Sequence, residues 1–289
     1  MKPPPFQYAS PTSVSDAVAL LVEHADEEPR ILAGGQSLVP LMNFRLAQPG
    51  YLVDLRRVAG LDTIRHDGEM LVIGAMVRQA TAERSPEVAL GAPLLAEALH
   101  HVAHLPIRNS GTVVGCMAHA DPAAELPAVA LAMDAEMTAV GPQGERRIPA
   151  AEFFQGPFTT ALGPDEILTE VRFPHWSGGH AFVEFARTHG NFALVGVAAL
   201  VGVQNGRISA AALAVSGLGP TPLRLSAAEQ ALVGAVPEGA AVSAAVDAGT
   251  ADLHPAGDLQ AGTTTRIDIA RAYLRRGIER ALDRALDRR

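Results

Sequence analysis

The chain has 289 residues, of which 48% are hydrophobic, so it can form one large domain or several smaller units around a sizeable core. Its formal net charge of -8 argues against nucleic acid as the main partner, because phosphate backbones are bound by clustered Lys and Arg. The single cysteine, Cys116, excludes an internal disulfide and provides too few ligands for an iron–sulfur cluster.

Two segments of the sequence indicate where in the cell the protein is located. Residues 1–5 (MKPPP) lack the apolar core of a signal peptide. The longest apolar run, 192–203, is too short to cross a bilayer. We therefore expect a soluble cytoplasmic protein with no membrane span.

Residues 1–56 predict a strand–helix–strand unit around a glycine loop. Ser13 or Ser15 caps a first helix with helical apolar spacing. A strand over 30–33 enters the loop 33–38 (AGGQSL), one or two helical turns follow, and the next strand covers 51–55. The loop thus lies between a strand and a helix.

Residues 57–176 predict a second unit that also contains a glycine loop, 111–116 (GTVVGC). The other expected elements are a hairpin of 62–66 with 70–74, helices over 86–102 and 122–133, a hairpin of 138–140 with 146–148, and a strand over 167–173.

A domain boundary is expected in the turn region 174–179. Beyond it, strands over 181–187, 194–203 and 207–215 predict a three-stranded antiparallel sheet, and Asn205-Gly206 marks a hairpin turn. Helices over 227–234, 239–248 and from 264 to the end complete this third unit.

The two glycine loops carry most of the functional information. Gly34 and Gly35 leave the backbone free to lie against a phosphate, and Gln36 and Ser37 add neutral donors. An ordinary strand-to-helix turn explains one such loop equally well. Because two loops suit a pyrophosphate better than one, the pair favours nucleotide binding.

Both loops and several further motifs resemble the FAD-binding medium subunit of the xanthine and carbon monoxide dehydrogenase family of molybdenum hydroxylases. The likeness covers essentially the whole chain. The matching motifs are 33–38, 107–109 (IRN), 111–115, 119–127 (HADPAAELP), 165–168 (DEIL), 172–174 (RFP), Arg187 with 191–193 (NFA), and 271–274 (RAYL).

This resemblance implies an α+β fold. A two-lobed FAD-binding domain of the vanillyl-alcohol oxidase (PCMH) type covers 1–176, with lobes of about 1–56 and 57–176. A smaller C-terminal domain of the CO dehydrogenase flavoprotein type covers 177–289. Expected partners are a large molybdopterin-binding subunit and a small subunit with two 2Fe–2S clusters, in a hetero-hexamer of two heterotrimers.

The resemblance also assigns FAD contacts, with no catalytic residue and no metal ligand in this chain. Residues 32–39 and 112–116 correspond to the pyrophosphate loops, Glu125 lies near ribose hydroxyls, and the Leu168 backbone approaches the flavin ring. Phe192 either stacks on the ring or packs in the core. The full set is Leu32, Ala33, Gly34, Gly35, Gln36, Ser37, Leu38, Val39, Ile107, Thr112, Val114, Gly115, Cys116, Ala118, Glu125, Leu168 and Phe192.

The chain departs from the family pattern at Val114, where a glycine is common, and at Cys116, where Asn or Ser is usual. Three histidines, His100, His101 and His104, have the spacing of metal ligands on one helical face, whereas the resemblance implies that this segment lines the edge of the flavin. The sequence leaves three alternative functions open for the chain: an electron-transfer FAD subunit, a self-contained FAD-dependent oxidoreductase, or a scaffold subunit without flavin.

Overall fold

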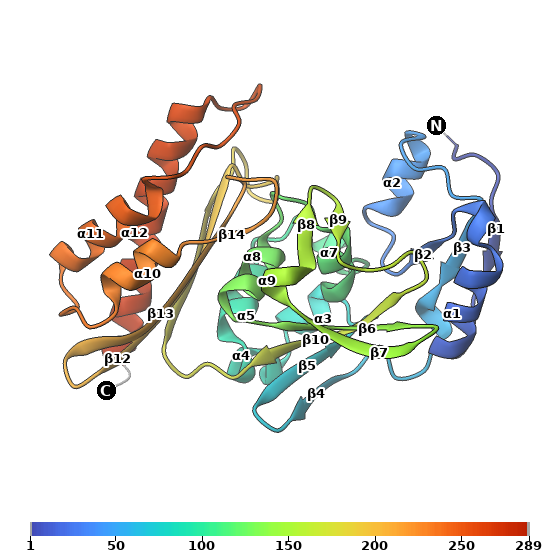
Figure 1. Cartoon of the computed structure of the whole chain (residues 1–289), viewed down its shortest axis with the longest axis horizontal. Helices are drawn as coiled ribbons and strands as arrows, with labels where there is room; N and C mark the ends of the chain where they lie inside the picture. The colour runs from blue at the N-terminus through green and yellow to red at the C-terminus, as the bar shows by residue number, and fades with distance from the viewer. Residues whose placement is uncertain (1, 288–289) are drawn as a thin grey trace.

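The computed structural model describes residues 2–287 and arranges them as three units in a row (Figure 1). The first unit is a parallel three-stranded sheet of order β1-β3-β2. Its elements are β1 (Gln7–Ala9), α1 (Val14–Glu23), a 3-10 turn (Ala25–Glu27), β2 (Arg30–Leu32), α2 (Leu38–Asn43), β3 (Tyr51–Asp54) and a second 3-10 turn (Leu55–Arg57). Ser13 caps α1 by accepting a hydrogen bond from the Asp16 N–H. Of the two caps that the sequence suggested, Ser13 and Ser15, the structure therefore uses Ser13.

The second unit is a five-stranded antiparallel sheet of order β4-β5-β10-β6-β7 covered by short helices. Its strands are β4 (Ile64–Asp67), β5 (Met70–Gly74), β6 (Glu136–Gly141), β7 (Gly144–Pro149) and β10 (Ile167–Pro174), with a small hairpin of β8 (Phe154–Gly156) and β9 (Thr159–Thr160). Its helices are α3 (Gln79–Glu83), α4 (Pro86–Gly91), α5 (Pro93–Leu99), α6 (Leu105–Arg108), α7 (Val113–His119), α8 (Glu125–Ala132) and α9 (Ala150–Phe153).

Two helix predictions in this unit need correction. The single helix expected over 86–102 is divided into α4 and α5, because Pro93 disfavours a helical backbone at Ala92, where φ is -139° and ψ 64°. The helix expected from Pro122 begins instead at Glu125. Asp121 holds the intervening turn, since its carboxylate accepts the Ala123 N–H at 2.9 Å.

The third unit is an antiparallel sheet of order β11-β12-β13-β14, four strands where three were expected. The additional strand, β14, has only two residues and pairs with the end of β13. The elements are β11 (Gly179–Phe185), β12 (Val195–Gln204), β13 (Arg207–Ser216), β14 (Leu223–Arg224), α10 (Ser226–Leu232), α11 (Gly239–Thr250) and α12 (Thr263–Asp287). Within residues 2–287, none of the helices combines the length and apolar character needed to span a membrane.

The sheet of the third unit is buried on both faces. One face packs against α10 and α12, which α11 covers in turn, and these elements share an apolar core, seen at the left of Figure 1. The other face joins the main core of the molecule through Phe182, Ala198 and Ala214, and packs against α5 and α8. The third unit is therefore fixed to the second by a continuous apolar contact.

Candidate functional site

The first glycine segment leaves a run of backbone donors open. It follows β2 and leads into α2, and Gly35 has a φ of +72°, a conformation that side chains with a Cβ rarely adopt. Within residues 2–287, the N–H groups from Gly34 to Leu38 donate no hydrogen bond. Successive open N–H groups of this kind form a concave site for an anion such as phosphate.

The second glycine segment is mostly helix, which corrects the loop expected over 111–116. Thr112 is the N-cap of α7, and its hydroxyl accepts the Gly115 N–H at 3.0 Å. The Cys116 N–H donates to the Thr112 carbonyl at 3.2 Å. Only the N–H groups of Thr112 and Val114 stay open at this turn within the described residues. The second segment thus offers fewer backbone donors than its glycines suggest.

The two segments lie against one another. A Cβ on Gly34 would meet the Ser110 carbonyl oxygen at 2.5 Å and the Gly111 Cα at 2.7 Å, so this contact excludes any side chain. A Cβ on Gly115 would lie 3.8 Å from the Ala33 Cβ. The structure therefore brings residues 32–39 and 110–115 together from separate units, as a pyrophosphate held by both would require.

The side chains of Val114 and Cys116 in the second segment pack against the main core. Val114 is 2% exposed and belongs to the main core, so its isopropyl group points away from the open N–H groups. Cys116 is half-buried and packs at the edge of this core, and burial raises the pKa of its thiol above the usual range. Ala118 is exposed on α7. The Val114 side chain therefore lies on the core side of this turn.

A second group of predicted residues gathers at the loop between β11 and β12. Phe192 in this loop is 65% exposed, so core packing is the wrong explanation for it. The loop lies on the segment before α6, because a Cβ on Gly190 would meet the His104 ring at 2.5 Å and the Ala103 carbonyl at 3.1 Å. Ile107, on α6, is also exposed. Both apolar side chains are therefore available to a flat ligand.

Leu168 lies on β10, which packs against α7. Its side chain is buried in the main core, and a register shift between Leu168 and Glu170 interrupts the pairing of β10 with β6. Such an irregularity re-aims the backbone locally. A backbone contact from Leu168, rather than a side-chain contact, is compatible with this geometry.

Glu125 is the first residue of α8 and is 6% exposed. Burial is the main cause that raises the pKa of Glu125 to about 7, and the nearby Glu184 charge raises it further. His101 Nδ1 lies 3.4 Å from Glu184 Oε1, and this hydrogen bond raises the pKa of His101. Motif reasoning missed Glu184. The strand periodicity of 181–184 was the available signal. Residues two apart in a strand share a face, so the carboxylate of Glu184 lies on the same face as the apolar side chain of Phe182.

The three histidines do not converge on a metal. His100 Nδ1 lies 2.8 Å from Glu83 Oε1, His101 faces Glu184, and His104 lies under Gly190. Among the described residues, no group of three or more His, Cys, Asp and Glu side chains has a geometry that could hold a metal ion.

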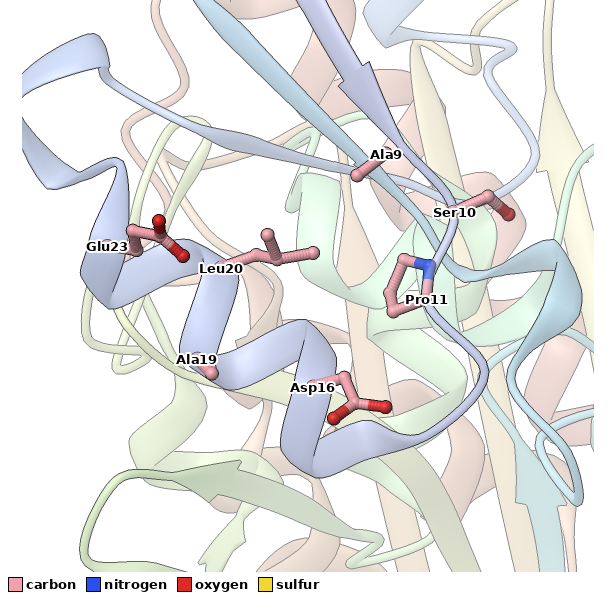
Figure 2. A pocket seen from close by; sticks show the side chains of 7 residues that line it. All are labelled: Ala9, Ser10, Pro11, Asp16, Ala19, Leu20 and Glu23. Carbon is pink, nitrogen blue, oxygen red and sulfur yellow. The ribbon is translucent and has the colours of Figure 1, made fainter.

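A separate shallow hollow lies on the first unit, between α1 and the segment after β1, where the Leu20 side chain points toward that segment (Figure 2). The residues that line it are Ala9, Ser10, Pro11, Asp16, Ala19, Leu20 and Glu23. The carboxylates of Asp16 and Glu23 would repel a phosphate. This hollow therefore does not compete with the glycine segments as an anion site.

Comparisons with known proteins identify the same two parts of the chain. Residues 4–176 match the family described as the FAD binding domain in molybdopterin dehydrogenase, and residues 180–281 match the CO dehydrogenase flavoprotein C-terminal domain.

Similar proteins span nearly the whole chain. The alpha subunit of the 6-hydroxypseudooxynicotine dehydrogenase complex of Paenarthrobacter nicotinovorans is 41% identical, over 97% of this chain and 96% of its own. The beta subunit of caffeine dehydrogenase from Pseudomonas sp. (strain CBB1) is 40% identical over the same shares. A structure of carbon monoxide dehydrogenase from Hydrogenophaga pseudoflava, in a form lacking the Mo-pyranopterin moiety of its cofactor, matches with a TM-score of 0.96 at 38% identity, over 99% of this chain and 100% of that one.

The resemblance seen in the motifs is thereby confirmed, as are the α+β architecture and the assignment to the oxidoreductases. Residues at the glycine segments also fit an anionic cofactor, since the N–H groups from Gly34 to Leu38 are open and the close contact of Gly34 with residues 110–112 holds them beside the second segment. The chain belongs to the family of FAD-binding subunits of molybdenum hydroxylases of the xanthine dehydrogenase and carbon monoxide dehydrogenase type.

Proposed function

We propose that this chain holds FAD across its two glycine segments and transfers electrons from a partner's iron–sulfur clusters to an external acceptor. The observation that carries this proposal is the run of open N–H groups from Gly34 to Leu38, packed against the turn at Thr112. FAD, when bound, supplies the capacity to accept and release electrons. The protein's part is to bind and orient it.

Each group of residues has a distinct part in this proposal. The backbone of 33–38 and the Thr112 and Val114 N–H groups face the pyrophosphate, and Glu125 accepts from sugar hydroxyls. The exposed Phe192 and Ile107 side chains and the Leu168 backbone would contact the ring. The Gly115 and Cys116 N–H groups are left out of the phosphate contacts, because they are already bonded within α7.

The similar proteins support a subunit role. The two relatives described above are named as subunits of a 6-hydroxypseudooxynicotine dehydrogenase complex and of caffeine dehydrogenase. These names specify different compounds, although the two proteins are about equally similar to this chain. We therefore assign substrate oxidation to a molybdopterin-binding large subunit, and electron relay to a small subunit with two 2Fe–2S clusters. The proposed assembly is a cytoplasmic hexamer of two heterotrimers. Within this chain, residues 1–176 form the FAD-binding domain and 177–289 the C-terminal domain.

A spectroscopic experiment tests the role. The chain is purified with the products of its adjoining genes, and the visible spectrum is followed after the iron–sulfur subunit has been reduced. Loss of the flavin absorbance only when that subunit is present supports the proposal. Turnover of an organic substrate by the chain alone would support the self-contained oxidoreductase instead, and a colourless chain that takes up no FAD would support the scaffold.

Two alanine substitutions test the placement of the cofactor. Gly35 and Gly60 have similar positive φ values, +72° and +83°, so Gly35→Ala and Gly60→Ala each introduce about 1 kcal/mol of backbone strain. Only Gly35 lies within the open N–H run. We expect Gly35→Ala to lose most of its FAD while Gly60→Ala retains it, as measured by the ratio of flavin to protein absorbance. Equal retention would contradict the placement.

A further inference from the structure

A cationic side chain from outside the two glycine segments reaches the place where they meet. Arg78 precedes α3, and its extended backbone forms an isolated antiparallel bridge with Thr112. Its Nη1 donates to the Ser110 carbonyl oxygen. The same oxygen lies against Gly34, since a Cβ on Gly34 would meet it at 2.5 Å. One carbonyl group therefore separates the Arg78 guanidinium from the first residue of the open N–H run.

Backbone hydrogen bonds on either side of Arg78 fix this position. The Val113 N–H donates to the Val77 carbonyl at 3.1 Å, and the Gln79 N–H donates to the Gly111 carbonyl at 2.9 Å. The backbone of Arg78 is thus held along the second segment. Its side chain extends from there to the contact with the first segment.

Arg78 differs from the other arginines that the fold buries or half-buries. It is half-buried, and within residues 2–287 it makes no ion pair. The other arginines in these burial classes each pair with a carboxylate, and they are Arg108, Arg172, Arg224, Arg266, Arg275 and Arg284. Removing a cation from water without an opposite charge is unfavourable. An anion from outside the chain would therefore stabilise Arg78.

Most of the hydrogen-bonding capacity of Arg78 is also unused. Its side chain makes one hydrogen bond among the described residues, to Ser110. A guanidinium carries about five N–H donors in a planar fork. The nearest arginine in sequence to the second segment, Arg108, is fully engaged by contrast. It donates to Glu83 through Nε and Nη2, and to two backbone carbonyls through Nη1.

The glycine segments themselves provide no positive charge. Residues 32–39 and 110–116 contain no Lys or Arg. The whole chain carries a formal net charge of -8, so its overall field repels an anion. Open N–H groups orient a phosphate but carry only partial charges. Arg78 therefore brings to this junction a full positive charge that the segments lack.

We propose that Arg78 is the counter-ion of the FAD pyrophosphate, bound at the junction of the two glycine segments. This inference rests on the proposed function, which places the pyrophosphate there. The planar guanidinium donates to phosphate oxygens, while Nη1 also holds the Ser110 carbonyl in place. The open N–H groups orient the phosphates, and Arg78 supplies the charge that favours FAD over a flavin without phosphate.

The first test measures the affinity of the FAD-free chain for FAD by fluorescence titration. We expect Arg78→Gln to weaken binding by about tenfold to a hundredfold, the usual effect of losing a hydrogen bond from a charged group. Arg78→Lys keeps the charge but not the planar fork, so its affinity should lie between those of Arg78→Gln and the wild type.

Arg207→Gln is the matched control for the first test. The Arg207 Nη1 also donates to a backbone carbonyl, that of Gly234, at 2.7 Å, and among the described residues Arg207 makes no ion pair. It lies on β13 in the third unit, and we expect this variant to keep wild-type affinity for FAD. Equal affinity of Arg78→Gln and Arg207→Gln would overturn the proposal.

The second test separates charge on the phosphates from mere support of the Ser110 carbonyl. Salt screens the attraction between a guanidinium and a phosphate, so the wild-type affinity for FAD should fall as ionic strength rises. We expect a shallower fall in Arg78→Gln, whereas Arg78→Lys and Arg207→Gln should keep the wild-type slope. Support alone would leave the slope of Arg78→Gln unchanged, and that result would overturn the proposal. If Arg78→Gln did not fold, a shallower slope or wild-type affinity in Arg78→Lys would overturn it instead.

The outcomes distinguish this inference from the proposed function. Wild-type affinity in Arg78→Gln, with loss of FAD in Gly35→Ala, overturns the role of Arg78 and leaves the proposed function standing. A chain that never retains FAD refutes the proposed function, and inorganic pyrophosphate then tests Arg78 alone. A rise in the unfolding temperature with pyrophosphate that Arg78→Gln abolishes and Arg207→Gln keeps would still support Arg78 as the anion-binding residue. The absence of that rise would refute both.

Discussion

The two glycine segments look alike in sequence and differ in what their backbones are free to do. From Gly34 to Leu38, the N–H groups are open within the described residues. In the second segment, Thr112 caps the Gly115 N–H and its carbonyl accepts the Cys116 N–H. A motif glycine is therefore not by itself a ligand contact. The hydrogen-bond partners of its N–H decide whether it is available.

The glycines themselves serve different purposes. Gly35 is required for its positive φ, whereas Gly34 is required because the backbone of 110–112 lies where its side chain would be. Gly115 closes the first turn of a capped helix against Ala33. The comparison assigns the phosphate contacts mainly to the first segment and the support mainly to the second.

Gly34→Val should have the largest effect. Its Cβ would meet the Ser110 oxygen at 2.5 Å and the Thr112 nitrogen at 3.0 Å, so the two segments must separate. We expect the loss of FAD retention together with about 3 kcal/mol of the free energy of unfolding. Absorbance of the purified chain and urea denaturation measure the two effects.

Gly262→Ala is the control for Gly34→Val, because a Cβ at Gly262 would meet no atom within 4 Å. This variant should keep both its FAD and its stability. If Gly34→Val retained FAD as well as the control does, the contact between the segments would have no part in holding the cofactor.

Much of the fold was predictable because local signals agreed with the tertiary structure. Asn205-Gly206 forms the expected hairpin turn, with φ values of 51° and 75°. The helix over 86–102 was predicted wrongly because its apolar period continues across Pro93, and periodicity does not register the steric effect of that proline on Ala92. The two-residue strand β14 was missed because it is too short to show alternation.

The candidate site was predictable in its first segment and less so elsewhere. Residues 33–37 form the loop that was predicted, and Leu38 begins α2. In contrast, the helix at 113–119 was mistaken for a loop, because its cap, Thr112, lies within the glycine motif and resembled a phosphate donor. Glu184 was not found because its importance depends on His101, which lies beside it but belongs to another part of the chain. Local patterns do not encode such meetings.

Val114→Ala tests whether the valine at this position obstructs the cofactor. The side chain is buried in the main core, so removing two methyl groups should cost about 2 kcal/mol of the free energy of unfolding. The Val114 N–H is unchanged, and we expect unaltered FAD affinity in a fluorescence titration. Tighter binding by Val114→Ala would mean that valine displaces the backbone from the phosphate.

Thr112→Val should have the smallest effect. It tests whether the Thr112 hydroxyl caps α7 or contacts the cofactor, and therefore whether the second segment binds phosphate as the first does. The hydroxyl of Thr112 is occupied by the Gly115 N–H at 3.0 Å, so its removal should cost about 1 kcal/mol, the usual value of a helix cap. The open Thr112 N–H is retained, so FAD affinity should stay the same once the loss of stability has been taken into account. Calorimetric unfolding with and without FAD measures both quantities on one sample. A drop in affinity much larger than the loss of stability would show that the hydroxyl contacts the cofactor, and would make the second segment a phosphate loop equal to the first.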